Sequence, residues 1–469
     1  MRYISTRGSA PPLGFEDVLL AGLARDGGLY VPERWPELSR EEIAALEGLP
    51  YAEAARRIMQ PFVGDALAPE ELAAIVEEAY AQFGHRAIAP LVQLAPGQWI
   101  LELFHGPTFA FKDFAMQVLA RLMDHALKRR DQRVTIVGAT SGDTGSAAIE
   151  AFRGRERADI FILHPEGRVS EVQRRQMTSA AEENVHNIAV RGTFDDCQAL
   201  VKALFNDHAL RDRLSLAAVN SINWARIMAQ TVYYFTSAVG LGAPHRPVSF
   251  SVPTGNFGDV FAGYVASRMG LPVSRLAIAT NVNDILVRAL ATGRYEARQV
   301  VATSSPSMDI QVSSNFERLI FEAAGRDADL VSAHMEEFAS TGAFSFSDNE
   351  LAFVRERFSA FRADEEETAA TLRSTLEGSA YLADPHTAVG LHAAQRMRGE
   401  EQPVITLATA HPAKFPDAVR AACGREAALP ERLAAVMEAP ERYTVLDNDY
   451  RTVSTFIESH ARVPAGAAP

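Results

Sequence analysis

Residues 134–146 read Val-Thr-Ile-Val-Gly-Ala-Thr-Ser-Gly-Asp-Thr-Gly-Ser. A short β-prone run is followed by a turn of small and hydroxyl-bearing residues, and a helical pattern continues from there. This order of strand, turn and helix is the unit from which parallel sheets are built. The turn also predicts an anion site, because backbone N–H groups at a helix N-terminus bind carboxylates or phosphates. It is not a P-loop, since the lysine expected after the last glycine is missing.

The same unit recurs along the chain. Strand-like apolar runs, most of them followed by a small-residue turn and a helical segment, lie at 99–104, 134–137, 160–163, 185–190, 248–252, 276–279 and 404–408. This alternation predicts an α/β protein whose parallel sheets are covered by helices on both faces. Ligands of such proteins bind beyond the carboxyl ends of the strands, where the turns collect.

The composition argues against several classes of protein. The 469-residue chain has a net charge of −13 and no lysine- or arginine-rich block, so nucleic acid and anionic membranes are not expected partners. No apolar run reaches the ~18–20 residues that span a bilayer, and the first residues lack the apolar core of a secretory signal. Cys197 and Cys423 cannot make a disulfide framework or a cysteine zinc site. We therefore expect a cytoplasmic protein without a metal.

Lysine is rare in this chain. Of the 46 basic side chains, four are lysines: Lys112, Lys128, Lys202 and Lys414. An arginine stays protonated, whereas a lysine amine can be desolvated, deprotonated and made nucleophilic. Lys112 lies in Phe104-His-Gly-Pro-Thr-Phe-Ala-Phe-Lys-Asp113 and is expected to begin a helix, where the helix dipole disfavours a cation. It is therefore either solvent-exposed or deprotonated in function, and it is our first candidate for a nucleophile.

Two further turns follow strand-like runs. Pro253-Thr-Gly-Asn-Phe-Gly-Asp259 contains Gly255 and Gly258, which allow backbone amides to approach a ligand closely at the start of a helix. A phosphate monoester fits such a turn. The segment Thr406-Leu-Ala-Thr-Ala-His-Pro412 places hydroxyl groups at the end of the last strand, where they either cap a helix or bond a ligand heteroatom.

Together these features suit one cofactor, pyridoxal 5'-phosphate. Lys112 would bond the aldehyde, and the glycine turn would hold the phosphate. A hydroxyl after the last strand would face the ring nitrogen, and the turn at 140–144 would hold the carboxylate of an amino acid.

The order of these motifs resembles that of threonine synthases of the longer microbial form. Further segments that carry the resemblance are Asp26-Gly-Gly-Leu-Tyr-Val-Pro32, Asn220-Ser-Ile-Asn-Trp-Ala-Arg226, Asn281-Val-Asn-Asp284, Asp384-Pro-His-Thr-Ala-Val-Gly390 and Ala410-His-Pro-Ala-Lys-Phe415. The resemblance implies a pyridoxal-phosphate fold of the tryptophan-synthase-β type. It also implies a lyase of threonine biosynthesis that converts O-phospho-L-homoserine and water to L-threonine and phosphate.

The resemblance implies roles for the residues that contact the cofactor. Lys112 matches the Schiff-base lysine. Thr409 matches the hydroxyl that faces the pyridine nitrogen, with Thr406 as the alternative. The loop around the cofactor phosphate is matched by Gly255, Asn256, Phe257 and Gly258. Asp143 falls where related enzymes place an asparagine beside the ring oxygen. A carboxylate there would repel a phenolate, so Asp143 must be protonated, rotated away or paired.

The residues that contact the substrate follow in the same way. The carboxylate loop is matched by Thr140, Ser141 and Thr144. The substrate phosphate needs positive charge or several donors of its own, and our candidates are Ser221, Asn223, Arg226 and Lys414. For Arg226, a purely structural place at a helix start is an equal alternative.

The resemblance also implies a division of the chain. A mostly helical N-terminal domain is expected at 1–90, and a small α/β domain at 113–224. A large cofactor domain is expected from 91–112 and 225–469, with a charged helical insertion at about 320–380. Each domain around the cofactor should contain a parallel sheet between two layers of helices.

Two other functions remain open on the residues alone. One is another enzyme of the same cofactor family, such as a threonine dehydratase. The region before residue 85 and the segment Ala410-His-Pro-Ala-Lys-Phe415 argue against it. The other is a catalytically silent protein that binds phosphorylated ligands, against which the intact Lys112 and both anion turns argue.

Overall fold

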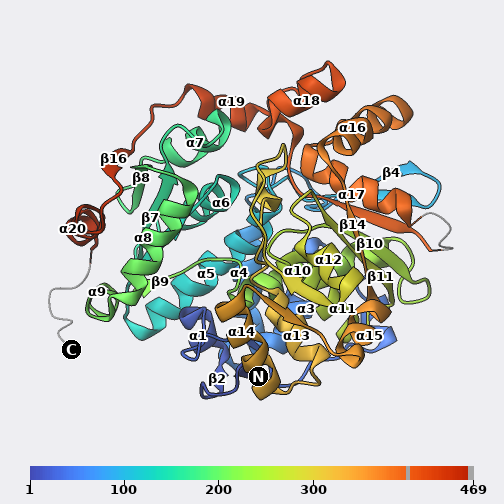
Figure 1. Ribbon diagram of the computed structural model, residues 1–469, viewed down its shortest axis with the longest axis horizontal. Coiled ribbons are helices and arrows are strands. Elements are labelled where there is room, and N and C mark those ends of the chain that lie inside the picture. The colour runs from blue at the N-terminus through green and yellow to red at the C-terminus, as the bar shows by residue number, and fades with distance from the viewer. Residues whose placement is uncertain (398–401, 463–469) are drawn as a thin grey trace. The chain divides into compact units, whose positions relative to one another are not determined.

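The computed structural model of the chain describes residues 1–397 and 402–462, which form two compact α/β units (Figure 1). Unit 1 consists of Met1–Val18, Leu23–Ala115 and Ser221–Ala428. Unit 2 consists of Leu19–Gly22, Met116–Asn220 and the described part of the segment that begins at Leu429. Each unit contains a parallel sheet, as predicted. Within the described residues, no helix combines the length and the apolar character needed to cross a membrane.

The sheet of unit 1 has six strands in the order β14-β11-β10-β15-β5-β4. All neighbours are parallel except β4, which is antiparallel to β5. The bounds of the strands are β4 (Leu91–Ala95), β5 (Gln98–Glu102), β10 (Val248–Pro253), β11 (Val273–Thr280), β14 (Phe358–Arg362) and β15 (Val404–Ala408). The central strands β10 and β15 are buried along their whole length, because helices cover both faces.

Two consecutive residues of β10, whose side chains point to opposite faces of the sheet, identify the two covering layers of unit 1. Ser251 Oγ donates to Gly390 O of α17 (Pro385–Arg396) at 2.6 Å. On the opposite face, Phe250 packs edge-on against Tyr234 of α10 (Trp224–Gly240), with ring centroids 4.7 Å apart. The three layers are therefore α17, the sheet, and α10 with its neighbour α11 (Gly258–Arg268).

The N-terminal region belongs to unit 1 except for Leu19–Gly22, at the end of α1, which belong to unit 2. Its helices are α1 (Phe15–Ala21), α2 (Arg40–Ala44), α3 (Tyr51–Val63) and α4 (Pro69–Tyr80), and its small antiparallel sheet contains β1 (Arg2–Ser5), β2 (Leu13–Gly14) and β3 (Tyr30–Pro32). The mostly helical character is as predicted. Its helix α3 packs on α10 of the same unit, where the Phe62 and Trp224 rings lie 5.6 Å apart.

Unit 2 contains a five-stranded parallel sheet in the order β16-β8-β7-β6-β9. Its strands are β6 (Val134–Ala139), β7 (Ala158–Pro165), β8 (Val185–Arg191), β9 (Leu216–Ala217) and β16 (Thr444–Asp447). Its helices are α6 (Asp143–Phe152), α7 (Glu171–Thr178), α8 (Phe194–Asn206), α9 (His208–Leu214), α19 (Glu431–Glu438) and α20 (Tyr450–His460), together with most of α5 (Lys112–Arg130).

The C-terminal segment differs from the expected division. The expected large domain includes this segment, but β16 pairs with β8, and α20 packs on the core of unit 2 through Val453 and Ile457. A four-residue edge strand carries too little sequence pattern to indicate which sheet it joins. Its long-range pairing with another strand determines this instead.

The charged insertion at about 320–380 is also not wholly helical. Its helices are α13 (Phe316–Ala323), α14 (Ala328–Thr341), α15 (Asp348–Arg357) and α16 (Glu365–Ser379). However, β14 forms the edge of the main sheet, and β13 (Ala343–Ser345) pairs with β12 (Arg294–Glu296). The sequence pattern did not indicate the short strands β13 and β14, because charged residues surround them. The remaining helices of unit 1 are α12 (Ile285–Thr292) and α18 (Pro416–Cys423).

Candidate active site

Lys112 is the first residue of α5, at the end of the loop that follows β5. This loop is bonded along its main chain to the segment after β15. Leu103 N–H donates to Ala408 O at 3.0 Å, and Phe111 N–H donates to Thr409 O at 2.9 Å. The pairing of β5 with β15 thus brings Lys112 and Thr409 onto adjoining segments, although they lie far apart in the sequence.

The position of Thr409 differs from that of Thr406. Thr406 is an interior residue of β15, and a Cβ placed on Gly390 of α17 would lie 2.9 Å from its methyl carbon. It therefore belongs to the packing between sheet and helix. Thr409 is the residue that follows the strand, at the carboxyl edge of the sheet. Its placement supports the assignment of Thr409 over Thr406.

Buried hydrogen bonds hold the turn before Lys112 in place. The Asp113 carboxylate accepts hydrogen bonds from Thr108 N–H and from the Thr108 hydroxyl, both at 2.7 Å. Thr108 O in turn accepts from Lys414 Nζ at 2.9 Å, and Lys414 is fully buried. A Cβ on Gly106 would lie 2.4 Å from that of Asp113, so only glycine fits there. These contacts fix the backbone from which the Lys112 side chain extends.

A second loop contacts the Lys112 amine. Lys112 Nζ donates to Ser307 Oγ at 3.3 Å, and Ser307 N–H donates to His386 Nε2 at 3.2 Å. His386 Nδ1 lies 2.7 Å from Asp384 Oδ2. Because Nε2 accepts a backbone hydrogen, Nδ1 must carry the proton that is donated to Asp384. The buried pair Asp384–His386 therefore orients the Ser307 loop beside Lys112.

The Ser307 loop is closed by an aspartate. The Asp309 carboxylate accepts hydrogen bonds from Asn281 Nδ2 (2.8 Å), Asn283 Nδ2 (3.1 Å), and the Thr303 hydroxyl (2.7 Å) and N–H (3.0 Å). The asparagines follow β11 at the carboxyl edge of the sheet. The motif at 281–284 thus shapes this loop.

The turn after β10 has its carbonyl groups bonded on one side. Gly255 O accepts from the Ser313 hydroxyl at 2.6 Å, and Asn256 O accepts from Asn315 N–H and Nδ2 at 3.0 and 3.1 Å. In a planar trans peptide the N–H points opposite to the C=O. The N–H groups of Asn256 and Phe257 therefore face away from the 313–315 segment.

The same turn begins α11. Phe257 occupies the N-cap position with φ 65°, and within the described residues no side chain caps the helix there. Its ring is buried against Phe316, 5.0 Å away, which stabilises this left-handed backbone. A Cβ on Gly255 would lie 2.8 Å from Ser307 O, and one on Gly258 would lie 3.3 Å from Asn315 Nδ2. The result is a tight turn at a helix N-terminus, which suits an anion.

The one acidic residue in the first turn of α11 is directed into the core. The Asp259 carboxylate accepts from the hydroxyls of Tyr233 and Tyr234 at 2.6 and 2.9 Å. Burial raises the pKa of Asp259 to about 6, although both hydroxyls act to lower it.

The segment before α10 also meets Asn315. Asn315 Nδ2 donates to Ser221 O at 3.2 Å, and the Asn223 side chain caps α10 by accepting from Ala225 N–H at 3.0 Å. Arg226 lies in the first turn of this helix and is buried, which lowers its pKa to about 10. Ser221, Asn223 and Arg226 are therefore brought together on one helix start.

The remaining predicted residues lie in unit 2, in the turn between β6 and α6. Thr140 Oγ accepts from Gly142 N–H at 3.0 Å and from Gly145 N–H at 2.9 Å, so its hydroxyl shapes the turn. Ser141 is exposed and Thr144 is half-buried.

Asp143 is the first residue of α6 and is paired. Its Oδ1 accepts from Gln173 Nε2 at 2.8 Å, and Gln173 Oε1 accepts from the Ser170 hydroxyl at 3.0 Å. The serine fixes the orientation of the amide, so that Gln173 presents its donor to the carboxylate. Of the three alternatives for Asp143, the structure shows pairing.

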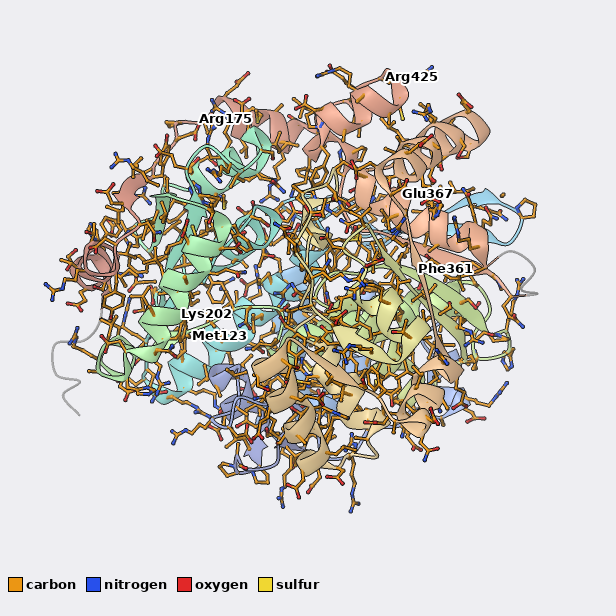
Figure 2. The ribbon with its side chains drawn as sticks, in the orientation of Figure 1. Met123, Arg175, Lys202, Phe361, Glu367 and Arg425 are labelled. Atoms are coloured by element: carbon orange, nitrogen blue, oxygen red, sulfur yellow. The ribbon has the colours of Figure 1, made fainter. Side chains whose placement is uncertain are left out.

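The four lysines occupy different surroundings. Lys128 and Lys202 are exposed on helices of unit 2, and Figure 2 shows Lys202 on α8. Lys112 is half-buried beside Ser307, and Lys414 is fully buried. The two lysines that the sequence indicates as candidates are thus the two that are not exposed.

The sequence does not indicate several residues that bond the predicted ones, among them Ser307 and Asn315 in unit 1 and Gln173 in unit 2. None lies in a strand-to-helix turn, and their partners are distant in the sequence. Asp384 and His386 lie in a motif that carries the resemblance; the sequence predicts only that His386 shapes the turn next to Pro385, and it indicates no role for Asp384. The Asp-Pro-His order was itself a signal, since it is typical of a capped helix start.

The sequence matches three known families. These are described as "Threonine synthase N terminus" over residues 2–80, "Pyridoxal-phosphate dependent enzyme" over residues 85–342, and "Threonine synthase, C-terminal" over residues 387–457. A threonine synthase of Pseudomonas aeruginosa is 55% identical over 462 residues, which cover 98% of each chain.

Solved structures give the same result. The crystal structure of pyridoxal-phosphate-bound threonine synthase from Brucella melitensis has a TM-score of 0.97 and 57% identity, and the match covers 99% of this chain and 100% of that one. Threonine synthase from yeast has a TM-score of 0.93 and 39% identity, with 98% of each chain covered.

Proposed function

The chain belongs to the threonine synthase family, and we propose from its residues how it converts O-phospho-L-homoserine and water to L-threonine and phosphate. It is a pyridoxal-phosphate enzyme with the tryptophan-synthase-β type of fold. The observation that carries the proposal is the placement of Lys112 at the start of α5, on a loop that is bonded to the Thr409 segment.

The residues present fit the cofactor. We propose that the N–H groups of Asn256 and Phe257, together with the start of α11 at Gly258, bind its phosphate, since that helix end has no side-chain cap among the described residues. Lys112 supplies the amine for the aldehyde, and Thr409 supplies a neutral partner for the ring nitrogen. When bound, the cofactor acts as an electron sink for the carbon next to the substrate amine.

Lys112 is the proposed base. With cofactor and substrate bound, the Lys112 amine would remove the proton from the substrate α-carbon and would return protons in later steps. Ser307 Oγ lies 3.3 Å from Nζ and can direct that amine. Because a threonine hydroxyl cannot protonate a pyridine, donors around the site must share the stabilisation of negative charge.

The substrate carboxylate is assigned to the turn at 140–144. Thr140 holds the turn, so Ser141, Thr144 and the backbone N–H groups are the proposed donors. Asp143 is the proposed neighbour of the cofactor ring oxygen, with Gln173 holding its carboxylate.

The substrate phosphate is assigned to Ser221, Asn223, Arg226 and Lys414, because a phosphate dianion must be met by positive charge and donors when it leaves water. Arg226 and Lys414 are both buried. We also propose the cytoplasm as the location, which agrees with Cys197 and Cys423 both being free thiols.

Measuring which product is released tests the activity itself. We expect phosphate release from O-phospho-L-homoserine, with formation of L-threonine, and little ammonia release from serine or threonine. Efficient ammonia release from threonine without turnover of the phosphorylated substrate would favour the dehydratase instead. Absence of both reactions in the cofactor-loaded enzyme would favour the silent binder.

Lys414→Met is expected to raise the KM for O-phospho-L-homoserine about tenfold and to weaken inhibition by inorganic phosphate, since one charge-assisted contact is lost. The visible absorbance of the bound cofactor should stay unchanged. Steady-state kinetics and a spectrum check this. A lower kcat and an altered spectrum with an unchanged KM would contradict it. Lys414 would then act by supporting Thr108, and Arg226 would become the candidate for the phosphate.

His386→Asn and His386→Gln form a matched pair of variants. Glutamine can still place an acceptor near Ser307 N–H, whereas the shorter asparagine reaches only toward Asp384. We expect His386→Asn to lower kcat about tenfold with little change in KM, and His386→Gln to recover part of that loss. Equal losses in both variants would contradict a positioning role through Ser307.

A further inference from the structure

A buried arginine without a carboxylate partner lies beside the proposed phosphate turn. Arg318 of α13 is 0% exposed. Its guanidinium donates to Tyr30 O at 3.0 Å, to Ile222 O at 2.6 Å and to the side-chain oxygen of Asn315. All three acceptors are neutral, and among the described residues Arg318 forms no ion pair. The adjacent Glu317 carboxylate is bonded to Arg7 at 2.9 Å.

Arg326 provides a comparison within the same unit. Both guanidinium groups lie over tryptophan rings, Arg318 on Trp224 and Arg326 on Trp35. Both also bond carbonyls near β3, since Arg326 donates to Glu33 O at 2.7 Å. Arg326 has a carboxylate partner, however, because its Nε donates to Glu322 at 2.8 Å. Binding to carbonyl groups therefore does not by itself explain why Arg318 lacks a carboxylate partner.

A buried charge without a counter-charge is strongly unfavourable in a low-dielectric interior. A structural role alone could be filled by a neutral donor, which would avoid that penalty. The contacts of Arg318 indicate what balances its positive charge. Asn315 accepts from Arg318 through its side-chain oxygen, and it donates to Asn256 O through both its backbone N–H and its Nδ2.

We propose that Arg318 is the counter-charge of a phosphate monoester dianion bound at the 255–258 turn, toward which it acts through Asn315. This inference rests on the proposed function, which assigns the cofactor phosphate to that turn. Arg318 is a positioning residue, since its contacts are with Asn315 and with carbonyl groups. Asn315 holds Asn256 by two bonds and Ser221 by one, which favours the phosphate of the cofactor over that of the substrate.

The test compares pyridoxal 5'-phosphate with pyridoxal, which lacks the phosphate. Dissociation constants for both are measured by absorbance titration of the cofactor-free enzyme, in the wild type, Arg318→Gln and Arg326→Gln. We expect the preference for the phosphorylated form to fall about tenfold in Arg318→Gln, as one buried charge is removed. It should be unchanged in Arg326→Gln, the matched control. Arg318→Lys, which keeps the charge, should keep the preference and serves as the variant to use if Arg318→Gln does not fold.

Each of the other possible results contradicts a different part of the argument. If Arg318→Gln weakens binding of both compounds equally, or if Arg318→Lys loses the preference, then the arginine only ties carbonyl groups together and the proposal is overturned. A change confined to the KM for O-phospho-L-homoserine would assign the charge to the substrate phosphate and would also overturn it. If the wild type itself shows no preference for the phosphorylated form, then the assignment of the cofactor phosphate to this turn fails instead.

Discussion

Lys112→Ala is expected to abolish threonine formation while leaving both units folded. No other amine in the proposed site is placed to bond the cofactor aldehyde, since Lys414 is buried with its ammonium on Thr108 O. The same side chain is the proposed base, so the variant loses two functions at once and should lose at least about a thousandfold in kcat. Phosphate release and circular dichroism check activity and folding.

Two control variants accompany Lys112→Ala. Lys202→Ala removes an exposed lysine on α8 and should keep wild-type activity. Lys112→Arg keeps the charge but should fail like Lys112→Ala, because a guanidinium is not a nucleophile at neutral pH. Threonine formation by Lys112→Ala at a normal rate would show that the lysine assignment is wrong. Activity in Lys112→Arg would show that charge rather than amine chemistry is required.

Gly255→Val is expected to weaken binding of pyridoxal 5'-phosphate and to lower activity about a hundredfold, because a small displacement of positioning groups has a large effect. The new Cβ would lie 2.8 Å from Ser307 O and 3.0 Å from Ile310 Cδ1. Either the phosphate turn or the Ser307 loop must therefore move. Cofactor titration and steady-state kinetics measure the effect.

The other glycines of the chain provide a graded series. Gly258→Ala places its Cβ 3.3 Å from Asn315 Nδ2 and should have a smaller effect, whereas a Cβ on Gly378 meets nothing within 4 Å. Gly378→Ala should therefore leave cofactor binding unchanged. Unchanged affinity in both Gly255→Val and Gly258→Ala would place the phosphate outside this turn.

Much of the proposed site could be predicted because its parts are local patterns. A strand, a small-residue turn and a helix start follow one another within a few residues, and each turn indicates what its backbone can bind. Lys112 is proposed on chemical grounds, since a lysine amine stands out among arginines. The contacts of Asp384 and His386 could not be predicted for the opposite reason. Their pattern indicates a helix cap, but the contact with Ser307 appears only in the folded chain.

The sequence by itself determined the α/β class and the strand-to-helix turns, and it indicated Lys112 as the candidate amine, because these depend on residue type and short-range periodicity. The tertiary structure decided which distant segments support those turns. It paired β16 with β8, set Ser307 against Lys112, and placed Arg318 and Asn315 next to the proposed phosphate turn. The physical reason is that hydrogen bonds and burial join atoms through space, so a buried charge and its partners leave no spacing in the chain by which they could be recognised.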